Sequence, residues 1–192
     1  MELKQLASNA TYLTIDWLII SVLSLLFWVV SGKLLVSEQL GVVATSYNLA
    51  SVIAMIATLG ISNALYKLIS EYIGSNKGKI VSSLIKSSFK ILIISNSIIF
   101  LGLFLLSETL SPILKLPPEV LIITAVITLF LSISNTLGFI QLGFQNMKSY
   151  MTTNAISHAI RLLGAAGFTL LGFTFFGPLI GGASTLTTAR RA

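Results

Sequence analysis

The sequence predicts an all-α membrane protein, a bundle of about five transmembrane helices plus a truncated sixth. Hydrophobic residues make up 55% of the 192 residues and charged residues only 9%, whereas roughly 25% of the residues in a soluble domain are charged. The mean hydropathy is +0.94. A soluble fold of this length has too little interior to bury so many apolar side chains, but a lipid bilayer solvates them. Residues 1–192 are therefore expected to form a single transmembrane domain.

The individual helices follow from apolar runs, since a spanning helix needs about 20 mainly apolar residues. Ser37 and Glu38 suggest an N-cap and first turn for the second helix. Pro112 predicts the end of the third, and Pro118 with Glu119 predicts the start of the fourth. The expected helices cover residues 12–36, 42–68, 81–110, 118–144 and 150–173, with a partial helix at 175–186. The last segment is too short to span, so it is expected to be a helix cut off early or a re-entrant or interfacial segment.

Lysine distribution predicts the orientation. The loop between the second and third helices carries Lys67, Lys77 and Lys79, the next loop is net acidic, and the one after it carries Lys148. Because short cytoplasmic loops hold the excess of Lys and Arg, the N-terminus is expected in the cytoplasm of a multi-pass protein of the cytoplasmic membrane. The basic residues are dispersed along the chain, so membrane lipids are expected as partners and nucleic acid is not.

Sequence motifs disfavour an enzyme. The chain contains no HExxH, GxSxG or P-loop pattern, has one histidine and lacks cysteine. A cysteine nucleophile, a thiolate metal site and a disulfide framework are therefore excluded. No cofactor or metal is expected.

The strongest candidate site lies in the fifth predicted helix. Asn154, Ser157, His158 and Arg161 are spaced i, i+3, i+4 and i+7, so they share one helix face. Arg161 lies about half-way along the span, where a charge usually faces a cavity or a partner, and a guanidinium there suits an anionic headgroup. Alternatively, Arg161 bonds a backbone carbonyl or a neighbour such as Asp16 and holds the bundle together, and His158 makes a packed interhelical hydrogen bond.

Two further groups of polar residues lie within the predicted spans. Lys86 and Lys90, one turn apart in the third helix, are candidates for a basic cytoplasmic mouth of the cavity, or else extend to the interface and contact anionic lipid. Asp16 is expected to be interfacial. Interhelical hydrogen bonds are the expectation for the remaining polar side chains, Asn63, Asn96, Ser132 and Asn135.

Three segments resemble one transporter family. Segment 59–72, LGISNALYKLISEY, is similar to the end of helix two in polysaccharide and oligosaccharide flippases of the multidrug/oligosaccharidyl-lipid/polysaccharide exporter superfamily. Segment 34–41, LLVSEQLG, resembles the stretch that follows helix one in that family, and segment 141–148, QLGFQNMK, resembles the exit of helix four. None of these motifs is catalytic.

The resemblance implies a function and an architecture. Members have two six-helix lobes around a central cavity and move lipid-linked sugars across the membrane by alternating access. The chain resembles an N-terminal lobe, so its expected partners are an anionic lipid-linked sugar and a missing C-terminal lobe or second chain, and it is not expected to transport alone. One alternative is a cation-coupled multidrug-type antiporter, which would require a carboxylate in its cavity. The other is a non-transporting membrane assembly protein.

Overall fold

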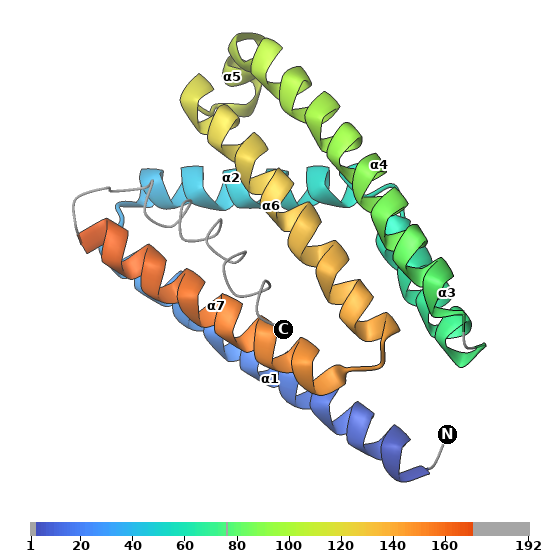
Figure 1. The fold of residues 1–192 in the computed structure, drawn as a ribbon. Coiled ribbons are helices and arrows are strands. Elements are labelled where there is room, and N and C mark those ends of the chain that lie inside the picture. The colour runs from blue at the N-terminus through green and yellow to red at the C-terminus, as the bar shows by residue number, and fades with distance from the viewer. Residues whose placement is uncertain (1–2, 76, 171–192) are drawn as a thin grey trace.

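The computed structural model describes residues 3–75 and 77–170, and all the regular secondary structure within them is helical. An all-α fold is therefore confirmed. Figure 1 shows the helices crossing at several angles. They are α1 (Leu3–Leu34), α2 (Ser37–Ala57), α3 (Ile61–Gly74), α4 (Gly78–Leu105), α5 (Ser107–Leu114), α6 (Pro118–Gly143) and α7 (Met147–Leu170).

Four of these helices, α1, α2, α4 and α6, are long and apolar enough to cross a membrane. Their outward faces carry large exposed apolar side chains, such as Trp17 on α1 and Ile56 on α2, that a bilayer would solvate. The 24-residue α7 is long enough, but polar residues in its first half lower its hydropathy, so a fifth span remains a prediction. The partial helix expected at 175–186 lies outside the described residues.

The predicted helix at 42–68 is wrong as a single element, because it divides into α2 and α3. Leu59 and Gly60 have positive φ angles of 48° and 72°, and two left-handed residues in succession interrupt the helical hydrogen-bond ladder. Glycine adopts this conformation without the steric cost that leucine meets. Ser95 of α4 donates a hydrogen bond of 2.9 Å to the carbonyl of Ala57, which satisfies one carbonyl freed at the break.

Other boundaries also differ from the prediction. Ser37 is the first residue of α2 and not its N-cap, which is Val36 and makes no side-chain capping bond. Pro112 does not end the third predicted helix, because α4 stops at Leu105 and Pro112 lies inside the short α5. The predicted start of α6 is confirmed, with Pro118 and Glu119 in its first turn.

The break before α7 is shorter than the predicted polar segment 145–149. Gln145 takes a left-handed φ of 58°, and the Asn146 side-chain oxygen accepts a 3.1 Å hydrogen bond from the backbone N–H of Ser149. This is N-cap geometry, so the helix begins at Met147 rather than at Tyr150.

Helix α6 is the centre of the bundle and packs against α2, α3, α4, α5 and α7. A row of buried hydroxyls repeats every four residues along it, at Thr124, Thr128, Ser132 and Thr136. Ser132 donates to the Asn96 side-chain oxygen on α4 at 3.1 Å, and the Thr136 and Ser62 hydroxyls lie 3.1 Å apart across α6 and α3. Asn96 and Ser132 thus make the interhelical hydrogen bond predicted for them.

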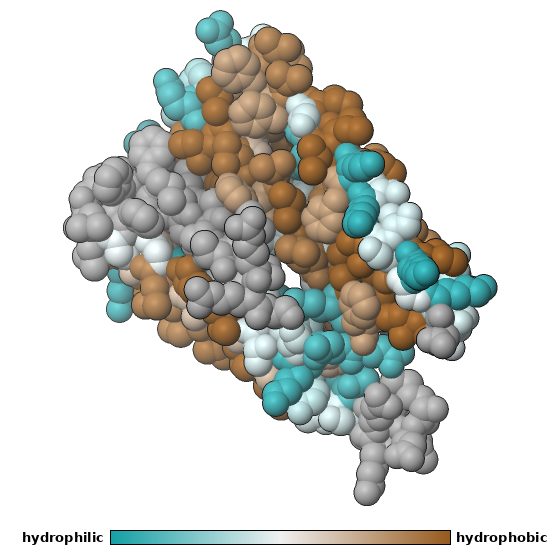
Figure 2. Space-filling model, in the orientation of Figure 1, coloured by the Kyte–Doolittle hydropathy of each residue, from teal (hydrophilic) through white to brown (hydrophobic). Residues whose placement is uncertain are grey.

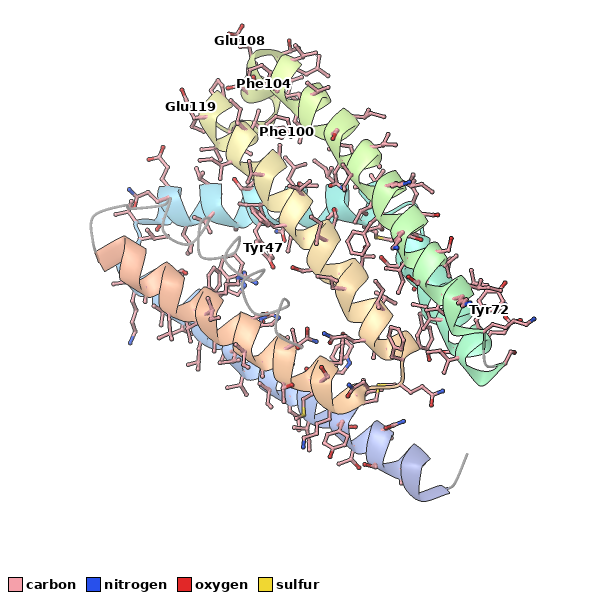
Figure 3. All side chains as sticks on the ribbon, viewed as in Figure 1. Tyr47, Tyr72, Phe100, Phe104, Glu108 and Glu119 are labelled. Atoms are coloured by element: carbon pink, nitrogen blue, oxygen red, sulfur yellow. The ribbon has the colours of Figure 1, made fainter. Side chains whose placement is uncertain are left out.

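Helices α1 and α7 form a second unit beside this bundle and run side by side along their lengths (Figure 1). The start of α1, the α3–α4 connection and the α6–α7 connection lie toward one end of the molecule. The opposite end carries Glu108 and Glu119 (Figure 3). Lys77, Lys79 and Lys148 belong to the first end, and a cytoplasmic location of that end stays a prediction.

This arrangement gives a topology prediction for single cysteines in the naturally cysteine-free chain. With intact cells, an impermeant thiol reagent added outside is expected to label Thr109→Cys, on α5, and to spare Ser75→Cys, after α3, because lysine-rich connections remain in the cytoplasm. Both native residues are exposed, and permeabilised cells provide the control in which both variants are labelled. The reverse pattern would overturn the orientation.

Candidate functional site

A cavity of about 320 Å³ lies between α2, α6 and α7. In Figure 2, hydrophobic residues cover much of α4 and α6, whereas hydrophilic residues gather around the α6–α7 connection, beside one end of this cavity. Among the residues that the structure describes, the cavity wall contains one guanidinium and no carboxylate. Its polar members are Tyr47, Ser51, Ser134, Asn135, Gln141, Tyr150, Thr153, Asn154, Ser157, His158 and Arg161.

The cavity lies where α6 and α7 diverge from the turn that joins them (Figure 1). There the Tyr150 ring lies against Gly138, so closely that a Cβ added to the glycine would sit 3.0 Å from the ring. Beyond this contact α7 packs mainly along α1 and only lightly against α6. The two helices therefore diverge, and α2 closes the space between them.

Arg161 is the cation of this wall, with only 7% of its surface exposed. Its Nη1 donates a 2.7 Å hydrogen bond to the Tyr47 hydroxyl, and Tyr47 lies in the space between α2 and α7 (Figure 3). The guanidinium carbon is 4.1 Å from the centroid of the Phe27 ring and 4.0 Å from that of Tyr47. Arg161 thereby joins α7 to both α1 and α2.

These contacts make the buried charge tolerable without cancelling it. Placing an arginine within a membrane span costs about 2.5–3.5 kcal/mol on insertion scales, and each cation–π contact returns roughly 0.5–2 kcal/mol. Two rings and one hydrogen bond therefore offset most of the cost. The Nε of Arg161 is buried without a hydrogen-bond partner, and no ion pair to Arg161 is found within residues 3–75 and 77–170. Arg161 therefore keeps its full positive charge, and only one of its five N–H donors is used in the hydrogen bond to Tyr47.

Asp16 does not pair with Arg161, which was one of the alternatives, but with Asn154. It is buried well inside α1, with 2% of its surface exposed, because α7 covers this face of α1. Its Oδ2 accepts a 3.2 Å hydrogen bond from the Asn154 side-chain amide, and its Oδ1 is buried with no partner. The carboxylate lies behind the cavity and does not line it.

The structure brings Asn154, Ser157, His158 and Arg161 to the same cavity, as their helical spacing indicates. It does not bring Lys86 and Lys90 there. Both are exposed on α4, and Lys86 lines a separate pocket beside the α3–α4 connection. The α4 helix packs on α3 and α6, away from α7, so these lysines are not at the mouth of this cavity.

Several wall residues were not predicted. Tyr47 stands in a polar triplet, Ser46, Tyr47 and Asn48, within an apolar run, which is a usable signal for a functional position. Gln141 belongs to the family-like segment 141–148, which predicts no site role for it. Phe27, which contacts Arg161 without lining the cavity, is one of many aromatic residues in an apolar sequence and carries no signal of its own. For metals, the described residues hold no group of three or more His, Cys, Asp or Glu side chains able to bind one.

Comparison with known families gives one match. Residues 6–187 match the family model for polysaccharide biosynthesis protein, which spans all seven described helices apart from the first residues of α1. Comparisons with curated proteins and with solved structures give no significant match. The resemblance found in the sequence is thus confirmed at the level of the family. The protein belongs to the polysaccharide biosynthesis protein family, a family of membrane transporters of the flippase type.

Proposed function

We propose that the protein takes part in moving an anionic lipid-linked oligosaccharide or polysaccharide precursor across the cytoplasmic membrane by alternating access. The observation that carries this proposal is Arg161, a buried cation without a counter-ion among the described residues, on the wall of a polar cavity. A polyprenyl pyrophosphate would supply the missing anion. Arginine suits it, because its planar fork can donate to two phosphate oxygens at once.

His158 and Asn154 complete the proposed anion site. Both line the cavity on the Arg161 side of α7, and each can donate a hydrogen bond to a phosphate oxygen. Asn154 already donates one amide N–H to Asp16, which fixes its orientation and leaves the second N–H of the same amide for a phosphate oxygen. Lys86 and Lys90 fall outside this site, and their exposure on α4 instead favours contact with anionic lipid headgroups.

The proposal includes the rest of the translocation path. The family resemblance implies a second lobe or second chain that would face this cavity and complete its walls. The basic connections near the start of α1 favour a cytoplasmic N-terminus in the cytoplasmic membrane. A non-transporting assembly protein would have no need of a polar cavity beside a buried charge, so the cavity favours a transporter.

A cation-coupled antiporter is the second candidate, and the buried Asp16 with its unpartnered Oδ1 is the observation that favours it. Against it, the carboxylate does not line the cavity, and the charge that does is positive. A cationic substrate in this cavity would be repelled by Arg161 and would lack an acid to pair with.

Transport assays in inverted membrane vesicles from the cells that naturally make the protein, in which the proposed second lobe or chain is also present, separate these functions. We expect ATP-independent uptake of a polyprenyl-pyrophosphate-linked sugar, above that of vesicles lacking the protein, and no uptake of an organic cation such as ethidium. Uptake of ethidium without uptake of the lipid-linked sugar would favour the antiporter. Uptake of neither would contradict the transporter assignment of this cavity.

A further inference from the structure

We infer that the end of the cavity next to the α6–α7 connection is a sugar subsite, in which Gln141 and Tyr150 hold the first sugars attached to the pyrophosphate. This inference rests on the proposed function. It adds that the protein distinguishes substrates by the sugar attached to the carrier. It divides the cavity into an anion end at Arg161 and a neutral, hydrogen-bonding end.

The first observation is an unused hydrogen-bonding group. The side-chain oxygen of Gln141 is buried without a hydrogen-bond partner, and Gln141 lines the cavity. Leaving a buried polar group unpaired costs about 1–3 kcal/mol, so such groups in native structures call for a partner. A sugar hydroxyl can donate to this oxygen and accept from the same amide's NH₂ group.

The second observation is the chemical character of the neighbouring wall. Residues Asn135, Tyr150 and Thr153 line the cavity with Gln141, and all are uncharged. Amide and hydroxyl groups that both donate and accept match the hydroxyls at the rim of a sugar, and an aromatic ring matches its C–H faces. A few convergent polar groups beside an aromatic surface are typical of sites that orient a small ligand.

Gly138 fixes the position of that aromatic ring. The Tyr150 ring rests over this glycine, where a Cβ would stand 3.0 Å from Cε2 and 3.7 Å from Cδ2. The absence of a side chain therefore lets the ring lie close to α6. Even an alanine at position 138 would push the ring outward, into the space assigned to the sugar.

The separation of the two ends fits a sugar linked to a pyrophosphate. Tyr150 and Arg161 both lie on α7, and their 11-residue separation corresponds to roughly 16 Å along the helix axis. This length exceeds a single phosphate group and suits a pyrophosphate followed by one or two sugar rings. The ligand can therefore reach both ends at once.

Binding measurements on the purified protein test the subsite. The probes are bare polyprenyl pyrophosphate and the same carrier bearing glucose, galactose or N-acetylglucosamine. We expect at least one sugar to tighten binding over the bare carrier. Gln141→Leu, which removes the amide at similar volume, and Gly138→Ala are expected to weaken binding of that sugar-linked carrier by about tenfold, with the affinity for the bare carrier unchanged.

The control is Gln39→Leu, the same exchange on α2 at a residue that does not line the cavity, and it should leave both affinities unchanged. If wild-type protein binds the bare carrier but none of the three sugars adds affinity, the sugar subsite is wrong and the proposed function stands. Equal weakening of both ligands by Gln141→Leu would also overturn the subsite, because Gln141 would then not act on the sugar in particular. If the bare carrier does not bind at all, the proposed function itself fails.

Discussion

Replacing Arg161 with alanine is expected to lower translocation of lipid-linked sugar per inserted molecule by at least about 30-fold. Removing one partner of a buried, hydrogen-bonded charge pair costs about 2–5 kcal/mol, and in the proposed complex Arg161 pairs with the pyrophosphate. Arg161→Lys should recover part of the activity, because lysine keeps the charge but loses the bidentate fork. The measurement is transport in inverted vesicles, normalised to the amount of inserted protein.

Stability measurements separate this role from a purely structural one. If Arg161 serves only to join α7 to Tyr47 and Phe27, alanine should lower abundance or melting temperature, and transport should fall only in proportion. Tyr47→Phe tests the contribution of the hydrogen bond to Arg161, since it removes the hydroxyl that accepts from Arg161 and keeps the ring. Lys90→Ala, which removes a cation from the exposed face of α4, is the matched control. Unchanged specific activity of Arg161→Ala would contradict the proposed anion site.

Gly143→Ala is expected to destabilise the fold more than a typical surface exchange. A Cβ at this position would lie 2.9 Å from Cβ and 3.1 Å from Cγ2 of Ile69, and 3.3 Å from the Tyr66 carbonyl oxygen. Neither a branched side chain attached near the backbone nor a helix backbone can move away cheaply. Forcing α3 and α6 apart should cost about 1–3 kcal/mol and lengthen the 3.0 Å hydrogen bond from the Ser70 hydroxyl to the Gly143 carbonyl.

Thermal unfolding in detergent measures this effect against Gly102→Ala on α4. No atom lies within 4 Å of the Cβ position at Gly102, so the same exchange there should be neutral or stabilise the helix by up to about 1 kcal/mol. A lower melting temperature for Gly143→Ala only is the expected result. Equal melting temperatures of the two variants would show that the close approach of α3 and α6 is not maintained.

The elements predicted well from the sequence are those fixed by local chemistry. The paired signals of Pro118 and Glu119 gave the start of α6 because both act within one helical turn. The shared face of Asn154, His158 and Arg161 followed from helical periodicity alone. The division of α2 from α3 was missed, because Gly60 is a single small residue within an apolar run and only its backbone conformation shows that the helix stops there.

The remaining part of the site depends on how the helices cross, which no local pattern reveals. The aromatic pair around Arg161 comes from Phe27 and Tyr47, more than a hundred residues earlier in the chain. The sequence shows Asp16 as an acid at the start of an apolar run. Its hydrogen bond with Asn154 could not be predicted, because it depends on the long contact between α1 and α7. Lys86 and Lys90 looked equivalent to Arg161 by charge, although α4 places them on a different face of the bundle.

Substrate protection of a cysteine at Ser157 tests the central claim most directly, because it asks whether the lipid-linked sugar occupies the cavity between α2, α6 and α7. Ser157 lines that cavity, and the chain has no native cysteine. The measurement is the rate at which a small hydrophilic thiol reagent labels Ser157→Cys, with Ser75→Cys outside the cavity as the control. Saturating polyprenyl-pyrophosphate-linked sugar should slow labelling of Ser157→Cys several-fold and leave Ser75→Cys unchanged, whereas equal rates at Ser157→Cys with and without substrate would contradict the account.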